Sequence, residues 1–254
     1  MTNGSTMPPK NNPQPYKTVR DKLGTGDLVF LHGTSAAGVM IENLEKTLNW
    51  PPYSHVGMVI EDGGNLYFWD APGGGNCFPD PYSNDPDNRI YGKSVHTGCR
   101  VSVLDDLLAY YSTKTDAGGF WIRQLVSGVS AAQFTALRIF VNRVDGLLFP
   151  QGIGPGDPAA TGLGENYLAG QTGTSLWWGN YFCSQLVTDT YMHMGLVEMD
   201  DFPPNGYSPA AFGIDDPSTV GLRLVPPAKL GDTFFAEWDG PSGGGVDCDQ
   251  NRQT

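Results

Sequence analysis

The chain has 254 residues, a formal net charge of −12, and 34 glycines and 20 prolines, which together make up roughly a fifth of it, against about 12% in average usage. The acidic balance opposes binding to nucleic acid or to an anionic membrane surface, because both are polyanions. No apolar run approaches the roughly 18 residues of a transmembrane helix, so no integral membrane segment is expected.

The length favours one loop-rich globular domain. We expect a disordered arm over residues 1–20, a single domain over 21–239 and a flexible Gly-rich tail over 240–254. The N-terminal residues are polar and carry several prolines, with no apolar stretch of the kind that a signal peptide needs. The expected location is therefore cytoplasmic as synthesised, with any export left to a signal-independent secretion system.

Periodicity and turn signals predict the elements in chain order. They are a turn and buried strand over 23–31, a helix from 35 to about 49, a hairpin over 54–70, a long loop over 71–98, a strand over 99–104, a short helix over 105–111, a strand over 120–126, a helix over 130–144 that opens on a capping box, a second long loop over 147–179, a helix over 183–194, a Pro-rich crossing over 202–217, and strands at 221–225 and 234–238.

A cysteine stands in the first turn of the helix expected after residue 182. The unpaired N–H groups and the positive end of the helix dipole favour the thiolate of Cys183 over its thiol. Leu186, Val187 and Met194 recur at helical spacing, so one face of this helix is expected to be buried. An isolated cysteine is more often a small buried hydrophobic residue than a nucleophile, so the catalytic interpretation requires a histidine partner.

One histidine lies in a segment that would hold it rigidly. The four histidines are His32, His55, His96 and His193. His55 begins a short apolar run, and Asp62-Gly63 is a hairpin turn signal. A two-residue turn there places His55 directly opposite Asp70, with Cβ atoms about 4.5–5.5 Å apart. A three-residue loop would instead put the two side chains on opposite faces.

Aromatic residues precede both the histidine and the cysteine. Trp177, Trp178 and Tyr181 lead up to Cys183 and either line a substrate groove or cover the open end of the core; the two interpretations have equal weight. Tyr53, two residues before His55, is a candidate substrate-binding residue and a possible second donor to an oxyanion.

The remaining cysteines indicate no metal centre. Cys77 and Cys99 could pair in an oxidising compartment, and His96 with Cys99 could form half of a metal site. No Cys-x-x-Cys spacing occurs, so neither a zinc site nor a disulfide framework is indicated. We expect no metal and no other cofactor.

Three blocks carry a family resemblance. Residues 26–30 (GDLVF), 54–59 (SHVGMV) and 181–187 (YFCSQLV) resemble the signature blocks of circularly permuted NlpC/P60 proteins, the papain-like group that includes YiiX-type amidases and, more distantly, the lecithin:retinol acyltransferases. The histidine precedes the cysteine, as in the permuted group. The resemblance implies an α+β permuted papain-like fold in which a helix carrying Cys183 packs on an antiparallel sheet carrying His55. The third polar residue in YiiX-like members is commonly a glutamate, whereas this chain has Asp70.

The resemblance also implies a chemistry. The expected function is a cysteine hydrolase with a triad of Cys183, His55 and Asp70 and a thioester acyl-enzyme, acting first as an amidase or peptidase, for example on cell-wall peptides. The alternatives are a lipid-directed hydrolase or acyltransferase, such as a phospholipase or thioesterase, and a non-catalytic binding module. A wall substrate without a signal peptide suggests a secreted toxin effector with an inhibitor (immunity) protein as partner.

Overall fold

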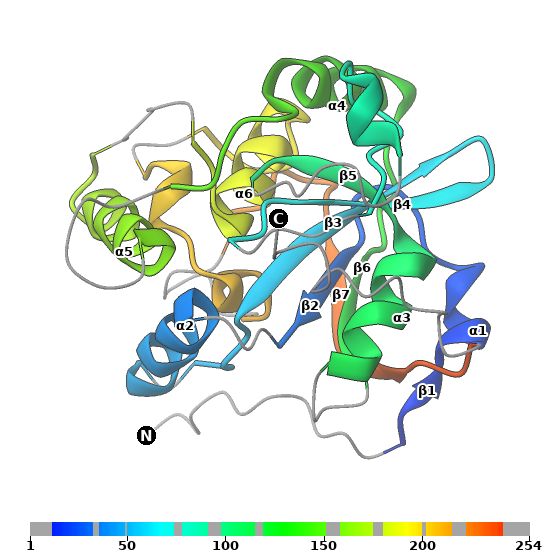
Figure 1. Cartoon of the computed structure of the whole chain (residues 1–254), viewed down its shortest axis with the longest axis horizontal. Helices are drawn as coiled ribbons and strands as arrows, with labels where there is room; N and C mark the ends of the chain where they lie inside the picture. The colour runs from blue at the N-terminus through cyan, green and yellow to red at the C-terminus, as the bar shows by residue number, and fades with distance from the viewer. Residues whose placement is uncertain are drawn as a thin grey trace.

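The computed structural model describes residues 12–32, 36–48, 50–73, 78–90, 98–114, 119–150, 158–174, 180–199, 202–214 and 222–240. A seven-stranded sheet forms the centre (Figure 1), in the order β1 (Gln14–Pro15), β7 (Leu230–Glu237), β6 (Gly119–Leu125), β2 (Leu28–Leu31), β3 (His55–Asp62), β4 (Asn65–Asp70) and β5 (Arg100–Val103). β1 runs parallel to β7, and the other neighbouring strands are antiparallel. The α+β class is confirmed, and the sheet is mixed rather than wholly antiparallel.

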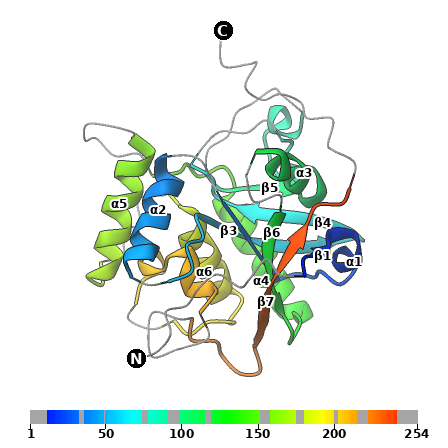
Figure 2. The same ribbon diagram turned by 90° about the horizontal axis from the view of Figure 1, so that it is seen from below.

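Helices cover both faces of this sheet. α4 (Ala131–Val144) and α6 (Cys183–His193) share one hydrophobic cluster with the sheet, and α1 (Tyr16–Arg20) and α3 (Leu104–Lys114) share the other. α2 (Ala36–Thr47) packs against α5 (Pro158–Gln171) to one side of the sheet (Figures 1 and 2). Three short 3₁₀ helices complete the described elements: η1 (Pro86–Arg89), η2 (Pro204–Gly206) and η3 (Pro209–Phe212).

Burial on both faces explains why the central strands read as continuous apolar runs. In β2, Leu28 and Phe30 face the cluster that contains α6, whereas Val29 and Leu31 face the cluster that contains α3. All four residues are buried, so no polar alternation is expected in this strand.

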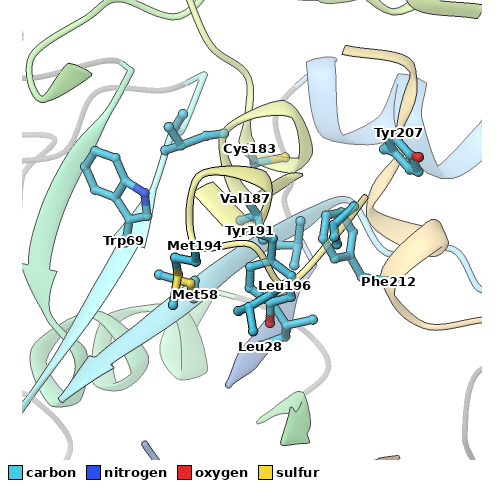
Figure 3. Packing of buried hydrophobic residues seen from close by; sticks show 14 of the residues in the cluster. Leu28, Met58, Trp69, Cys183, Val187, Tyr191, Met194, Leu196, Tyr207 and Phe212 are labelled. Atoms are coloured by element: carbon cyan, nitrogen blue, oxygen red, sulfur yellow. The ribbon is translucent and has the colours of Figure 1, made fainter. Parts of the chain in front are cut away.

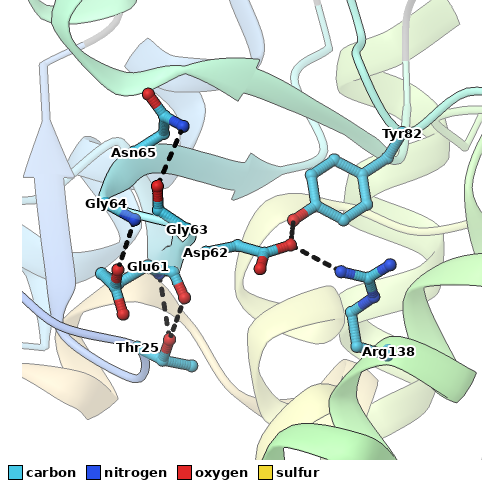
Figure 4. Close-up of polar contacts among 8 residues, drawn as sticks. All are labelled: Thr25, Glu61, Asp62, Gly63, Gly64, Asn65, Tyr82 and Arg138. Atoms are coloured by element: carbon cyan, nitrogen blue, oxygen red, sulfur yellow. Dashed lines mark hydrogen bonds and ion pairs between the residues drawn. The ribbon is translucent and has the colours of Figure 1, made fainter.

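The hairpin of β3 and β4 turns one residue later than predicted, which shifts the pairing register by two. Gly63 and Gly64 have φ of 62° and 81°, the left-handed conformation that a two-residue type I′ turn requires, and Asp62 pairs with Asn65. Figure 4 shows this turn, in which the Gly64 N–H donates to Glu61 Oε1 over 3.0 Å. The predicted register is therefore wrong.

A shift of two keeps the side chains on the same faces of the sheet. Continuing the observed register, Asp70 lies opposite Gly57, and His55 is its diagonal neighbour on the same face. The pairing of His55 with Asp70 is thus diagonal, where a direct opposition was expected.

Three further expectations about elements are corrected. The loop expected over 147–179 contains α5, in which Gly170 serves close packing: a Cβ there would come within 2.4 Å of the Gly206 nitrogen of η2. The strand expected at 221–225 is reduced to an isolated bridge between Leu224 and Val197. A flexible arm was expected over 1–20, but Tyr16 within it is buried, and its hydroxyl donates to Asp105 of α3 over 2.6 Å.

Within the part of the chain that the structure describes, no helix has both the length and the apolar character to cross a bilayer.

Candidate functional site

Cys183 is the first residue of α6. The N-cap residue, Phe182, has an extended backbone and caps the helix with no side-chain hydrogen bond. The first intrahelical bond runs from the Leu186 N–H to the Phe182 carbonyl over 2.9 Å, so the N–H groups of residues 183–185 have no partner within the helix. Cys183 therefore lies at the positive end of the helix dipole.

Packing against the sheet fixes this helix. The Trp69 indole N–H of β4 donates to Thr190 Oγ1 of α6 over 3.0 Å, and the Tyr191 hydroxyl donates to the Gly26 carbonyl. Figure 3 shows Cys183 in the first turn, with its sulfur directed away from Trp69 and toward the segment that carries Tyr207. Cys183 is only 2% exposed, so the surrounding residues shield its side chain almost completely from solvent.

A buried acid holds the imidazole of His55. His55 Nε2 lies 2.9 Å from Asp70 Oδ2, and Asp70 is fully buried. Because Nε2 faces the carboxylate, Nδ1 is the ring nitrogen left to face the thiol.

The second oxygen of Asp70 accepts a hydrogen bond from a buried arginine. Arg100 Nε donates to Asp70 Oδ1 over 3.4 Å, across the β4–β5 pair. The Nη1 and Nη2 atoms of Arg100 are buried and have no partner among the residues described. Asp70 thus bridges two cationic side chains, His55 when protonated and Arg100.

A glycine makes room beside this group. A Cβ on Gly57 would lie 2.2 Å from Cζ of Phe68, a separation that no real side chain adopts. The Phe68 ring occupies that space, with its centroid 6.3 Å from that of His55. Gly57 therefore lets an aromatic ring close one side of the site.

The neighbours of His55 change its charge state. Burial lowers the pKa of His55, but the negative charge of Cys183 and the hydrogen bonds to Asp70 and Cys183 raise it more, from 6.5 to about 10. A protonated imidazole beside a sulfur anion is the reactive form of a cysteine nucleophile.

A second buried carboxyl group lies near Cys183. Glu45 of α2 is fully buried, and its Oε1 accepts a hydrogen bond from the Ala210 N–H of η3 over 2.8 Å. Burial raises the pKa of Glu45 well above 4.5, and the charge of Cys183 raises it further. The sequence analysis missed Glu45 and Arg100; the available signal was a charged residue within an apolar helix stripe and within an apolar strand.

Two of the four predicted substrate-binding aromatics, Tyr53 and Tyr181, are among the described residues, and both are buried. Tyr53 is fully buried and stacks on Phe30 with ring centroids 4.4 Å apart. Tyr181 is 1% exposed, and its hydroxyl donates to Asp189 over 2.6 Å. Both are core residues in this structure, and Trp177 and Trp178 lie outside the described residues.

The other described histidines have different partners. His32 Nδ1 lies 2.7 Å from Glu42 Oε1, and His193 stacks on Phe140 at the far end of α6. Cys99 is buried, whereas Cys77 and His96 lie outside the described residues. Among the residues placed by the structure, no three His, Cys, Asp or Glu side chains gather as a metal site.

No protein-family model matches the sequence, and no curated protein matches it. Among solved structures, the chain is similar to the metalloprotein yiiX from Escherichia coli O157:H7, with a TM-score of 0.42 and 16% identity over 85% of this chain and 98% of that one. This similarity concerns the course of the chain alone.

Proposed function

We propose that the protein is a cysteine hydrolase, in which Cys183 is the nucleophile, His55 the general acid and base, and Asp70 the residue that orients the imidazole. One observation carries the proposal: His55 is held by a buried carboxylate through Nε2, 2.9 Å away, and it lies near enough to Cys183, at the start of a helix, for the charge of Cys183 to raise the pKa of His55. Nucleophile, base and orienting acid in contact are the arrangement that acyl transfer needs.

The reaction has two halves. The Cys183 thiolate attacks the substrate carbonyl carbon, and the new C–S bond leaves a negative charge on the carbonyl oxygen. The oxyanion collapses and the bond to the leaving group breaks, while protonated His55 gives its proton to that group. A water molecule then attacks the thioester as His55 takes its proton, the C–S bond breaks, and the acid product leaves.

The start of α6 supplies a donor for the oxyanion. The backbone N–H of Cys183 has no acceptor among the described residues, and it lies at the nucleophile itself. Donors placed where the charge develops are commonly the largest single contribution to catalysis. Tyr53 as a second donor stays a prediction, as do delivery as a toxin and an inhibitor protein partner.

The first candidate bond is an amide, as in an amidase or peptidase acting on a cell-wall peptide. An ester of a lipid is the second candidate, and an apolar cavity beside the N-terminus of α6 favours it. A protein that only binds a partner would have no use for a nucleophile in contact with a base.

The test compares wild type with Cys183→Ala, using Cys99→Ala as a matched control because Cys99 is the other buried cysteine described. Each protein is incubated with peptidoglycan peptides and with phospholipid vesicles, and products are identified by mass spectrometry. We expect Cys183→Ala alone to lose all hydrolysis. Hydrolysis that survives Cys183→Ala, or iodoacetamide labelling of Cys183 no faster than that of free cysteine, would refute the proposal.

A further inference from the structure

An apolar cavity of about 170 Å³ lies between α2 and α5, the two helices that stand side by side in Figures 1 and 2. Its walls are mainly aliphatic and aromatic; they include Met40, Ile41, Leu44, Leu163, Tyr167 and Phe182. At its edge, Leu168 of α5 is 64% exposed. Leu168 therefore adds exposed apolar surface beside the cavity.

The cavity adjoins the start of α6. Phe182 and Ser184, the residues on either side of Cys183, both line it. Ser208 and Pro209 line it as well, and they directly follow Tyr207, toward which the Cys183 sulfur is directed in Figure 3. Cys183 itself does not line the cavity, so a group held there lies beside the two residues that flank the proposed nucleophile.

The walls offer a ligand little hydrogen bonding. The Ser184 hydroxyl already donates to the Tyr207 carbonyl over 2.7 Å. Glu45, the charged residue next to Leu44, is fully buried and bonds the Ala210 N–H. An apolar cavity of about 150 Å³ stays dry and accepts benzene, so a cavity of this size fits an aliphatic group of roughly six carbons.

The position of His55 indicates on which side of the scissile bond the cavity lies. His55 must lie beside the leaving group in order to protonate it. The cavity is lined by α2, α5, the start of α6 and the segment around η3, and no residue of β3 or β4 lines it. The group held there is therefore on the acyl side, opposite the leaving group.

We propose that this cavity between α2 and α5 is the acyl subsite of the enzyme and that it takes a straight aliphatic chain of roughly six carbons. The inference rests on the proposed function and names its substrate class: carboxylic esters or amides whose acid is aliphatic. Each methylene that is buried on binding raises kcat/KM about fourfold. A hexanoyl substrate, with four more methylenes, should therefore exceed an acetyl substrate roughly 250-fold in kcat/KM.

A pocket-filling variant tests this assignment. Gly164 lines the cavity, and a Cβ there would meet Met40 only at ordinary contact distance, 3.7 Å, so Gly164→Leu fills the cavity without moving the backbone. Leucine also favours the helix more than glycine does. The matched control is Glu165→Leu, which adds the same side chain at the neighbouring exposed position of α5.

The substrates are p-nitrophenyl acetate and p-nitrophenyl hexanoate, with Cys183→Ala as the background. We expect Gly164→Leu to lose at least tenfold in kcat/KM on hexanoate and to keep its rate on acetate, whereas Glu165→Leu keeps both. Equal Cys183-dependent rates on the two esters, unchanged by Gly164→Leu, would overturn the acyl subsite and leave the proposed function standing. Release of hexanoate from dihexanoylphosphatidylcholine or from N-hexanoylglycine distinguishes a lipid source from an amide source.

A binding measurement keeps the cavity testable if no substrate is hydrolysed. Sodium octanoate is titrated calorimetrically into Cys183→Ala, with and without Gly164→Leu. Saturable binding that Gly164→Leu weakens at least tenfold supports the aliphatic site even where the proposed function fails. Absence of binding, or binding that Gly164→Leu leaves unchanged, overturns it.

Discussion

Two buried carboxyl groups, those of Asp70 and Glu45, belong to the surroundings of Cys183, and their partners differ. Asp70 contacts the His55 imidazole and the Arg100 guanidinium, whereas Glu45 accepts a hydrogen bond from a backbone N–H and has no ion pair with any described residue. Both side chains are fully buried. Burial alone disfavours a charged carboxylate. Asp70 has cationic partners that offset this cost, whereas Glu45 has none among the described residues and its pKa is raised well above 4.5.

The largest effect is expected at Asp70. Asp70→Asn replaces the carboxylate with an amide that can present its NH₂ to the imidazole, which favours the wrong tautomer. We expect kcat to fall about a thousandfold to ten-thousandfold, measured on the Cys183-dependent reaction. Asp62→Asn, at the end of β3 beside the hairpin turn, is the control, and a loss below tenfold at Asp70 would contradict its assigned role.

The free energy of unfolding of an Arg100 variant tests whether the arginine stabilises the buried carboxylate of Asp70. Arg100→Met leaves Asp70 buried without its arginine, a change that costs about 3–5 kcal/mol when one partner of a buried pair is removed. Arg138→Met is the matched control because Arg138 pairs with Asp62 over 2.5 Å at the surface (Figure 4), where such pairs contribute about 0–1 kcal/mol. Urea unfolding measures both, and equal losses would show that the arginine does not stabilise the buried acid.

The pKa of His55 depends on the charge of the neighbouring Cys183. In wild type, the pKa of His55 is raised from 6.5 to about 10, with the charge of Cys183 as the largest raising cause. Stability from protonated His55 is therefore fully present below about 6.5 and is lost as the pH rises through about 10. We expect the pKa of His55 to be lower in Cys183→Ala than in wild type, and NMR of the imidazole protons measures it. An identical pKa in both proteins would show that Cys183 does not influence His55.

A smaller effect is expected at Glu45. Since burial raises the pKa of Glu45 above 4.5, its neutral form favours the fold, and that contribution is lost as the pH rises above 4.5 toward the raised value. Glu45→Gln removes this dependence, so the variant should gain about 1–3 kcal/mol relative to wild type between pH 5 and pH 8.

Urea unfolding at the two pH values measures this gain. Glu165→Gln, at an exposed position of α5, is the control and should show none. A relative stability of Glu45→Gln that does not change with pH would mean that Glu45 is already ionised at pH 5.

Local patterns were sufficient to place Cys183 and His55 on their elements. α6 begins at Cys183 and α4 opens on the predicted capping box of Ser130 and Gln133, because helix starts depend on residues within one turn of each other. His55 and Asp70 lie in diagonal contact on one face although the turn was assigned wrongly, because a two-residue shift of the pairing register preserves the face of a strand.

Contacts between segments distant in sequence determined the helix α5 and the burial of Tyr53 and Tyr181, which local sequence patterns do not encode. α5 was expected to be loop because its glycines read as helix breakers, yet Gly170 is required by the close approach of η2. Tyr53 and Tyr181 were expected at a substrate surface, but segments distant in sequence cover both.

The amino-acid sequence by itself determined which elements carry the thiol, the imidazole and the acid, because those elements are specified by short-range periodicity and turn chemistry. Only the tertiary structure decided that Arg100 lies beside Asp70, that Glu45 is buried near the sulfur, and that α2 and α5 enclose an apolar cavity. The physical reason is that the charge state of a buried group and the shape of a cavity depend on every element packed around them, and no local pattern encodes that set.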